Sequence, residues 1–268
     1  MGSGMRALLL AAGLGTRLQP LTNFLPKCLV PINGRPLLDY WIENLLEQGV
    51  DEILINTHYR ASLVADYIQQ SSWNKRVRLV HEAQLLGTAG TALANRDFFH
   101  DEPFLIAHAD NLTRFNCAEF IDAHQRRPAN ASLTMMLFET DDPRSCGIVD
   151  LDKNGLVQAF HEKVENPPGN LANAAVYIVE PDVVAFMAAL GKSEIDFSTE
   201  VIPHFVGRIS TFVNTAYHRD IGTIKSWTDA QRDFGMPPAL PPNTLAWQKL
   251  TASLGPDLPQ LMENMTRI

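Results

Sequence analysis

Residues 5–27, MRALLLAAGLGTRLQPLTNFLPK, constrain the fold of this chain more than any other segment. The segment opens with an apolar run at 7–10 that is typical of a parallel strand buried on both faces. Small residues and glycines follow at once, so few side chains surround the backbone N–H groups of this turn. Because exposed N–H groups donate well to phosphate oxygens, a strand that leads into such a turn can bind a polyphosphate.

Two basic residues flank this turn. Arg17 follows the glycines, and Lys27 comes after a proline ten residues later. Their fixed positive charge suits the phosphates of a nucleotide. The segment does not match the dinucleotide fingerprint G-x-G-x-x-G, because Leu18 stands where the third glycine belongs. A dinucleotide-dependent oxidoreductase is therefore only a distant alternative.

Length and charge narrow the class of protein further. The chain has 268 residues, which is enough for one large domain or two small ones. Its formal net charge of −8 argues against nucleic-acid binding, so a phosphate site must be local. The sequence holds no apolar run of membrane-spanning length, which argues against a membrane protein. The three cysteines lack metal-binding spacing, so we expect reduced thiols in a cytoplasmic protein.

The first half alternates strand-like and helix-like segments, which predicts an α/β fold with a doubly wound, mixed but mainly parallel sheet. Residues 36–48 place leucines on one helical face, and Gly49 is suited to end that helix. The other predicted segments are strands at 51–57, 77–81 and 103–109 and helices at 62–70 and 90–95.

The second half changes character. Four strand-like segments lie close together, and a hairpin-turn signal, DKNG at 152–155, separates two of them. We expect these strands to form a mixed portion inserted over the parallel sheet. The predicted strands are 132–139, 146–151, 157–161, 174–179 and, last, 212–217, and the predicted helices are 181–190 and 198–205.

The two ends of the chain differ from the part between them. Residues 1–4, MGSG, resemble an expression remnant, and residues 5–235 carry the alternating pattern. Residues 236–268 are expected to form a proline-rich connector followed by a short helical tail. The apolar side chains of that tail could pack on the main domain or on a second subunit, so a homodimer is left open.

Asp110 is a candidate metal ligand, because it follows the predicted strand 103–109. Open α/β sheets bind ligands at the carboxyl ends of their parallel strands. A carboxylate there suits Mg²⁺, which proteins usually hold through one or two carboxylates plus substrate phosphates. Asp220, in the sequence HRDIGT, follows the last predicted strand. Taken alone, either aspartate would be read as a helix cap or a turn residue.

The string G-x-G-T-R-L-x-P-L-T at 13–22, with P-K at 26–27, resembles the signature of the sugar-1-phosphate nucleotidyltransferases. The resemblance extends over residues 5–233 and implies a Rossmann-like nucleotidyltransferase fold. No hexapeptide repeat is present, so the left-handed β-helix of some relatives is not expected. The resemblance also implies that a nucleoside triphosphate and a sugar 1-phosphate react to give a nucleotide sugar and pyrophosphate.

This resemblance assigns roles to the charged residues. Arg17 would neutralise the departing pyrophosphate, Lys27 would neutralise the α-phosphate, and Asp110 completes the catalytic set. Asp110 and Asp220 resemble the two metal-binding aspartates of the family and would hold Mg²⁺. The residues implied to bind the nucleotide are Ala11, Ala12, Gly13, Gly15, Thr16, Arg17, Glu82, Gly87 and Thr88.

The segment HEAQLLGTAG at 81–90 resembles the base-recognition segment of the family. Its glycines would let the backbone approach a flat base. Glu82 holds the position used against the base edge, and an ionised carboxylate can only accept hydrogen bonds. Guanine offers two adjacent donors, N1–H and N2–H₂, so GTP is favoured. Uridylyl-, thymidylyl- and cytidylyltransferases of the same fold are the alternative enzymes. The alternative for Glu82 itself is a solvated side chain before a loop, with no role in binding.

A second group of residues resembles the sugar-phosphate site. By this resemblance Lys163 would bind the phosphate, and Glu162 and Asn173 would bind sugar hydroxyls. Gly147 would let the sugar approach the backbone. Two departures leave the sugar open: Ala175 replaces a common glycine, and His218 replaces a common tryptophan.

The chain most resembles the mannose-1-phosphate guanylyltransferases and similar heptose enzymes within this family. Some members of the fold are non-catalytic nucleotide-sugar sensors or regulatory subunits, which is the alternative outside enzymes. The charged set is complete, and this favours the enzyme; it comprises Arg17, Lys27, Asp110, Lys163 and Asp220.

Overall fold

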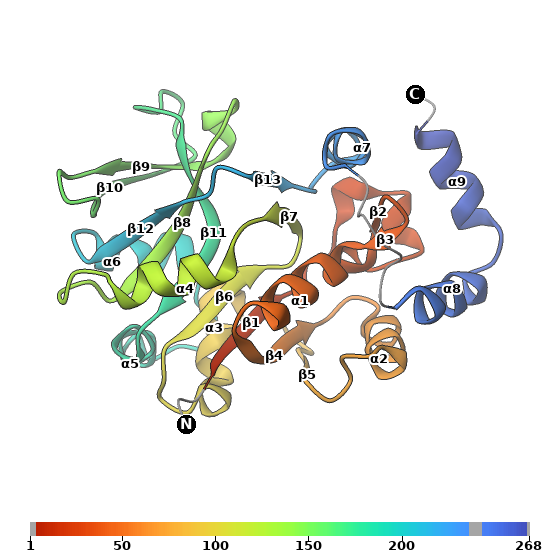
Figure 1. Ribbon diagram of the computed structural model, residues 1–268, viewed down its shortest axis with the longest axis horizontal. Helices are drawn as coiled ribbons and strands as arrows, with labels where there is room; N and C mark the ends of the chain where they lie inside the picture. Colours follow the sequence, from red (N-terminus) through yellow and green to blue (C-terminus); the bar gives the residue numbers. More distant parts are fainter. Residues whose placement is uncertain (1–3, 236–242, 267–268) are drawn as a thin grey trace.

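The computed structural model describes residues 4–235 and 243–266, which form a central sheet with helices on both faces (Figure 1). The predicted connector at 236–242 and residues 1–3 of the expected remnant lie outside the described residues. Among the residues that are described, no helix is long and apolar enough to cross a membrane.

The parallel part of the sheet confirms the predicted alternation of strands and helices. Its strands are β1 (Met5–Leu10), β4 (Val50–Thr57), β5 (Val77–His81) and β6 (Phe104–His108), and its connecting helices are α1 (Leu37–Glu47), α2 (Ala61–Gln70) and α3 (Gly87–Ala94). The strand order is β6-β1-β4-β5, and every pair is parallel. The chain moves outward from β1 to β5 and then returns to β6, so the direction of winding reverses between β1 and β6. Ligands bind at such a reversal in open α/β sheets.

The strands of the second half extend this sheet. They are β8 (Leu133–Glu139), β9 (Gly147–Leu151), β10 (Val157–Glu162), β11 (Leu171–Val179) and β12 (Ile209–Val213). The expectation that they lie over the parallel sheet is wrong, because β11 pairs directly with β6 in antiparallel fashion. The described residues thus form one nine-stranded mixed sheet, in which β8 and β12 join through β11. The DKNG hairpin is confirmed between β9 and β10, where Gly155 has a φ of 78°.

The predicted last strand at 212–217 is also wrong, because two strands in different sheets replace it. β12 ends at Val213, and β13 (Tyr217–Asp220) pairs with β7 (Asn111–Arg114) in a separate two-stranded sheet. Asn214 makes the transition: its N–H donates to the Leu137 carbonyl (2.7 Å), and its side-chain amide donates to the Tyr217 carbonyl (3.0 Å). The new pairing sets Asp220 opposite Asn111, the residue after Asp110.

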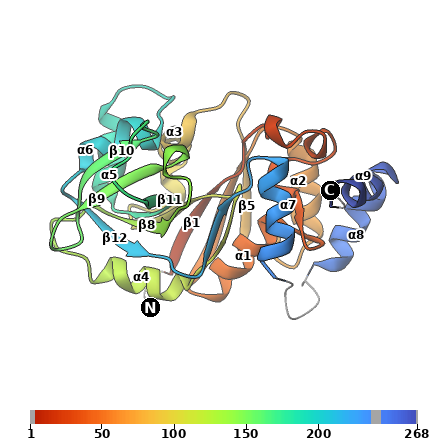
Figure 2. The same ribbon diagram turned by 90° about the horizontal axis from the view of Figure 1, so that it is seen from above.

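The core lies on both faces of the sheet, as the apolar β1 predicts. Ala7 and Leu9 face one hydrophobic cluster with α1 and α2, and Leu8 and Leu10 face the other with α3. Figure 2 shows α3, α5 (Pro181–Ala189) and α6 (Ile202–Phe205) on one side of the sheet and α1 and α4 (Cys117–Gln125) on the other. Each large apolar side chain buried in this way contributes roughly 1.5–3 kcal/mol.

Several elements were not anticipated from the hydrophobic pattern. They are α4, α7 (Ile224–Asp233), β7, β13 and the short strands β2 (Pro31–Ile32) and β3 (Arg35–Pro36). Both helices begin at side-chain caps, which are sequence signals. Asn116 Oδ1 accepts from the Glu119 N–H, and Thr223 Oγ1 accepts from the Ser226 N–H, each at 3.1 Å.

The described part of the tail is helical, and it packs on the main domain. It forms α8 (Thr244–Ser253), which lies beside α2 in Figure 1, and α9 (Asp257–Thr266), which follows α8. Leu250 and Leu258 are buried in the α1–α2 cluster, and Trp247 meets the Tyr67 ring edge-on at 6.1 Å. The Asn243 side chain accepts from the Ser72 N–H at 2.9 Å. These contacts place the tail on the main domain of the same chain.

Candidate active site

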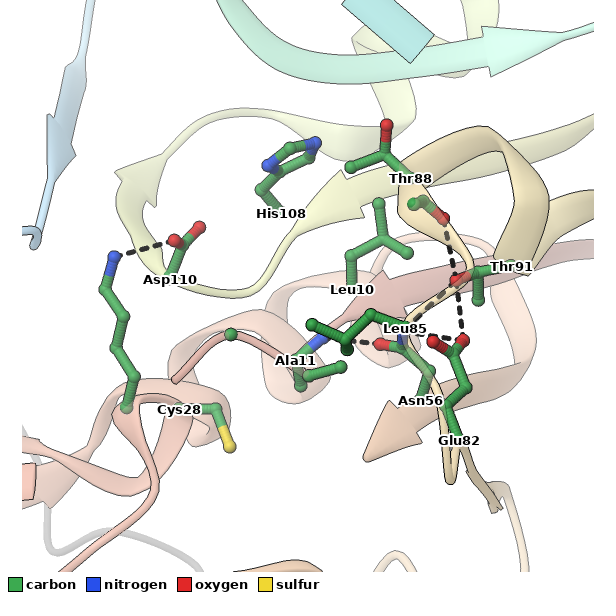
Figure 3. A pocket seen from close by; sticks show the side chains of 14 residues that line it. Leu10, Ala11, Cys28, Asn56, Glu82, Leu85, Thr88, Thr91, His108 and Asp110 are labelled. Atoms are coloured by element: carbon green, nitrogen blue, oxygen red, sulfur yellow. Dashed lines mark hydrogen bonds and ion pairs between the residues drawn. The ribbon is translucent and has the colours of Figure 1, made fainter. Parts of the chain in front are cut away.

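A cavity of about 210 Å³ opens at the carboxyl ends of β1 and β6, at the reversal of the winding (Figure 3). In Figure 3, His108 and Asp110 lie at one end of it, and Asn56, Glu82 and Thr91 lie at the other. The residues after β1 connect the two ends, and they belong to the lining: Ala11, Ala12 and Gly13.

The glycine-rich turn has room for a ligand at Gly13. A Cβ added there would meet no atom within 4 Å, whereas one on Gly15 would lie 2.8 Å from Thr22 Cγ2. Gly15 also has a φ of 65°, and its carbonyl accepts from the Thr22 hydroxyl at 2.8 Å. No hydrogen bond within the described chain uses the N–H groups of residues 12–15. Gly15 is therefore required by the turn, and Gly13 faces the space where a phosphate is expected.

Lys27 lies between the two aspartates that are expected to bind metal. Its Nζ atom is 2.6 Å from Oδ2 of Asp110 and 3.4 Å from Oδ1 of Asp220. The lysine side chain is only 8% exposed. Burial raises the pKa of Asp110, but Lys27, His108 and the hydrogen bonds to the carboxylate together outweigh burial, so the pKa lies below its ordinary value. Both carboxylates therefore converge on one positive charge.

This donor set suits a magnesium ion. Two converging carboxylates can hold Mg²⁺ when waters and phosphate oxygens complete its octahedron. Within residues 4–235 and 243–266, no three His, Cys, Asp or Glu side chains are grouped to hold a metal by themselves. A metal at Asp110 and Asp220 would thus depend on substrate oxygens.

The guanidinium group of Arg17 lies near Asp220, and the backbone of Gly222 lies next to both groups. A Cβ added to Gly222 would lie 3.1 Å from Nη2 of Arg17 and 2.5 Å from Oδ2 of Asp220. The absent side chain of Gly222 therefore leaves space for both charged groups. The structure thus gathers Arg17, Lys27, Asp110 and Asp220 from both ends of the family-like region.

Glu82 lines the cavity, but it is not a solvated side chain. It is 5% exposed, and three protein donors already bind it. Oε1 accepts from the Thr91 hydroxyl (2.6 Å) and the Asn56 amide (3.0 Å), and Oε2 accepts from the Leu86 N–H (3.3 Å). The structural alternative of a free surface glutamate is therefore wrong.

The reason for glycine at the positions after Glu82 differs from the expected one, which was the approach of a base. A Cβ on Gly87 would lie 2.5 Å from the Ile195 carbonyl oxygen, and one on Gly90 would lie 2.2 Å from the Ser193 carbonyl oxygen. Thr88 Oγ1 accepts from the Phe197 N–H at 2.8 Å. The space above these glycines is thus filled by the backbone at 193–195, so that loop, and not a base, requires glycine there. Gly87 and Thr88 nevertheless line the cavity.

The expected sugar-phosphate residues lie on β9, β10 and β11 or, for Lys163, directly after β10, and none of the four lines the cavity. Gly147 pairs with Glu162 across the hairpin, and a Cβ on it would lie 2.6 Å from Phe160 Cζ. Protein side chains, not a sugar, therefore fill the space above Gly147. Lys163 is exposed, and its Nζ atom lies 3.6 Å from Oε1 of Glu162. Its backbone has a φ of 49°. Asn173 donates to the Tyr177 hydroxyl at 2.7 Å.

The two departures from the family pattern have structural consequences. Ala175 adopts a φ of 54°, the left-handed region in which glycine is favoured. His218 packs against the Phe138 ring at 4.3 Å, and burial lowers its pKa to about 4. Its imidazole is therefore neutral at pH 7.

Sequence reasoning missed six residues of the cavity lining, and three of them carry nitrogen or oxygen in the side chain: Asn56, Thr91 and His108. Asn56 had a signal, because it is a polar residue near the carboxyl end of a predicted parallel strand, where ligands bind. Burial lowers the pKa of His108, although Asp110 and Asp196 act against this shift. A neutral histidine at the strand end has no comparable pattern in the sequence.

The fold and the site define an open-sheet α/β protein with a cavity that has free backbone donors, Lys27 and Asp110 in its lining, and with Arg17 and Asp220 beside that pair. A model of the family described as "Nucleotidyl transferase" matches residues 6–235, and the chain belongs to this family.

Known proteins of similar sequence have related names. The chain is 30% identical over 243 residues to a mannose-1-phosphate guanylyltransferase of Mycobacterium tuberculosis, with 87% of this chain and 67% of that protein covered. It is 32% identical over 186 residues to mannose-1-phosphate guanylyltransferase 1 of Arabidopsis thaliana, with 67% of this chain covered. The chain spans about half of that protein's length, 51%.

A solved structure of similar fold supports the same family. HddC from Yersinia pseudotuberculosis superimposes with a TM-score of 0.73 at 27% identity, covering 86% of this chain and 100% of that one. The same protein complexed with GMP-PN gives a TM-score of 0.72. The predicted family and fold class are thus confirmed.

Proposed function

We propose that this chain transfers a guanylyl group from GTP to a sugar 1-phosphate of the mannose or heptose type. The products are a GDP-sugar and pyrophosphate. The observation that carries this proposal is the position of Lys27 between Asp110 and Asp220, next to a cavity that begins at unpaired backbone N–H groups. Such an arrangement neutralises phosphate charge from several sides.

The chemistry is a displacement at the α-phosphorus of the triphosphate. A phosphate oxygen of the sugar 1-phosphate forms the new P–O bond. The bond from the α-phosphorus to its bridging oxygen breaks, and its electron pair leaves with pyrophosphate. Since the attacking oxygen is already anionic at neutral pH, no general base is needed. Catalysis then depends on positioning and charge neutralisation.

Each cationic group has a place in this step. The N–H groups of the turn would hold the triphosphate, Arg17 would neutralise the departing pyrophosphate, and Lys27 would neutralise the α-phosphate. Asp110 and Asp220 would hold Mg²⁺, which supplies further charge neutralisation at phosphate oxygens. Glu162, Lys163 and Asn173 are proposed for the sugar phosphate, on the neighbouring strands.

Three observations support guanine as the base. The two similar proteins from Mycobacterium tuberculosis and Arabidopsis thaliana are named guanylyltransferases, and HddC was solved with GMP-PN. The carboxylate of Glu82 lines the cavity and, with about four lone-pair sites, retains acceptor capacity beyond its three protein donors. About one acceptor site thus remains, on Oε2, for an N–H donor of the guanine edge.

Pyrophosphate release, measured with four nucleoside triphosphates, a panel of sugar 1-phosphates and with or without Mg²⁺, tests the proposal. Release in the GTP reactions alone supports the role of Glu82. Release with another triphosphate keeps the enzyme class and rejects the base. Binding of nucleotide sugar without release points to the regulatory alternative. A cytoplasmic location and a homodimer stay predictions.

A further inference from the structure

We infer that Asn56 is a positioning residue that sets the base preference of the site, by holding Glu82 in place beside the phosphate-binding turn. The inference rests on the proposed function, because it needs a base to be read by Glu82. Asn56 is 3% exposed and lies near the carboxyl end of β4, between the ends of β1 and β5. Figure 3 shows its side chain between Ala11 and Glu82.

The orientation of the Asn56 amide is determined by its neighbours. Its Oδ1 accepts from the Ala11 N–H at 2.7 Å, and its Nδ2 donates to Glu82 Oε1 at 3.0 Å. A backbone N–H can only donate, so the amide oxygen must face Ala11. The NH₂ group must then face the carboxylate. One side chain therefore ties the residue after β1 to the acid after β5.

Glu82 depends on neutral donors for its charge. Within the described ranges, no Lys, Arg or His side chain forms an ion pair with its carboxylate. The Thr91 hydroxyl has one proton and two acceptors within reach, Glu82 Oε1 (2.6 Å) and the Gly87 carbonyl (3.0 Å). The NH₂ group of Asn56 also donates to Oε1 of Glu82. Because a buried carboxylate is costly without donors, losing Asn56 should make Glu82 turn toward other donors.

The consequence falls on the base rather than on the phosphates. A turned Glu82 no longer presents the same acceptor to the base edge. The N–H groups of residues 12–15, by contrast, make no hydrogen bond to Asn56. A change at Asn56 that preserves the bond to Ala11 should therefore weaken base discrimination and leave triphosphate binding in place.

The substitution Asn56→Asp makes this separation. It has the same shape and retains an oxygen that can accept from Ala11, but it cannot donate to Glu82 when ionised. Thr91→Val removes the other donor to Oε1 without adding a charge, and it carries the test if Asn56→Asp fails to fold. Asn95→Asp is the matched control, because Asn95 donates to the Thr91 carbonyl at 2.8 Å and lies outside the cavity lining.

The measurements are kcat/KM for the four nucleoside triphosphates, calorimetric affinity for GTP and for inorganic triphosphate, and thermal melting of each variant. We expect Asn56→Asp to lower the preference for the favoured base about tenfold or more, and Thr91→Val to act in the same direction. Affinity for inorganic triphosphate should change less than about twofold, well within the context-dependence of one hydrogen bond. Asn95→Asp should keep the wild-type preference.

Two kinds of failure are distinguishable. Wild-type protein that binds no nucleoside triphosphate would reject the proposed function. Wild-type protein that prefers a base other than guanine leaves the inference intact, since Asn56→Asp must still weaken that preference. Folded Asn56→Asp and Thr91→Val proteins with unchanged preference would overturn the inference. Equal losses of GTP and inorganic triphosphate affinity would overturn it too, because they indicate a general distortion.

Discussion

The Nζ atom of Lys27 lies 2.6 Å from Oδ2 of Asp110, and this contact joins the end of the glycine-rich segment to the end of β6. The same amine is within 3.4 Å of Asp220, which lies on β13. Three segments that are far apart in the sequence thus place two carboxylates around one positive charge.

Replacing Asp110 should remove most of the activity. Asp110→Asn retains the shape of the side chain, but it loses the negative charge that a divalent cation and Lys27 both need. We expect pyrophosphate release to fall by about 10² or more, the scale of one electrostatic group, with a higher Mg²⁺ concentration for half-maximal rate. Asp97→Asn, at an exposed carboxylate, is the control. Near-normal rates for Asp110→Asn would contradict the metal assignment.

Gly13 should matter to the ligand and not to the fold. Gly13→Ala places a Cβ where the structure has no atom within 4 Å, so thermal melting should stay close to wild type. The new methyl would occupy the space next to the unpaired N–H groups, so KM for the triphosphate should rise about tenfold or more, as expected from one lost charge-assisted contact. Gly169→Ala, whose Cβ is equally unobstructed, should leave both quantities unchanged. An unchanged KM for Gly13→Ala would place the triphosphate elsewhere.

Gly222 should matter because it separates Arg17 from Asp220. A Cβ at Gly222 would come within 2.5 Å of Asp220 Oδ2, so Gly222→Ala must displace that carboxylate. We expect its kcat to fall, by less than the loss of about 10²–10³ expected for Arg17→Ala. Steady-state kinetics of both variants, with exposed Arg96→Ala as the control, check this order. A wild-type kcat in Gly222→Ala would show that the close packing of Arg17 and Asp220 around Gly222 does not affect turnover.

His124 should make the fold sensitive to acid. It is buried, with Nδ1 2.8 Å from Thr134 Oγ1 and Nε2 3.0 Å from Glu180 Oε1, and burial lowers its pKa to about 3. Because the unfolded chain takes up this proton near pH 6.5 and the folded chain does not, the stabilisation is complete above pH 6.5 and is lost as the pH falls toward 3. At pH 5 the loss should be about 2 kcal/mol.

Urea denaturation at pH 7 and pH 5 measures this effect. His124→Gln should be less stable than wild type at pH 7, because it loses buried contacts, but its stability should change less between the two pH values. His100→Asn, at an exposed histidine, should retain the wild-type pH dependence. Identical pH dependence in wild type and His124→Gln would disprove the assignment.

Ala175→Gly should not destabilise the protein, although glycine within a strand usually does. The φ of 54° costs an L-residue about 1–2 kcal/mol, and the greater freedom of unfolded glycine offsets about 0.5–1 kcal/mol of the relief. We expect Ala175→Gly to raise the free energy of unfolding by up to about 1 kcal/mol. Ala174→Gly, at the buried neighbour without a positive φ, should lower it. Chemical denaturation compares the two, and destabilisation by both would refute the strain argument.

Much of the fold could be predicted because the signals are local. The apolar run before the glycines, the leucine face ended by Gly49 and the DKNG turn each express a preference of a few neighbouring residues. Gly49, for example, follows α1 with a φ of 108°, a conformation that side chains rarely adopt. The placement of β8–β11 was missed because an apolar strand has the same pattern whether it lies over a sheet or at its edge.

The sequence by itself determined which chemical groups this protein brings to a phosphate site: Arg17, Lys27, Asp110 and the bare turn around Gly13. Only the tertiary structure decided what those groups and their neighbours contact. In the folded chain, Glu82 accepts hydrogen bonds from Asn56 and Thr91, and the backbone at 193–195 packs against Gly87 and Gly90. The physical reason is that motifs express local conformation and charge, whereas close approaches between remote segments depend on how the whole sheet is assembled.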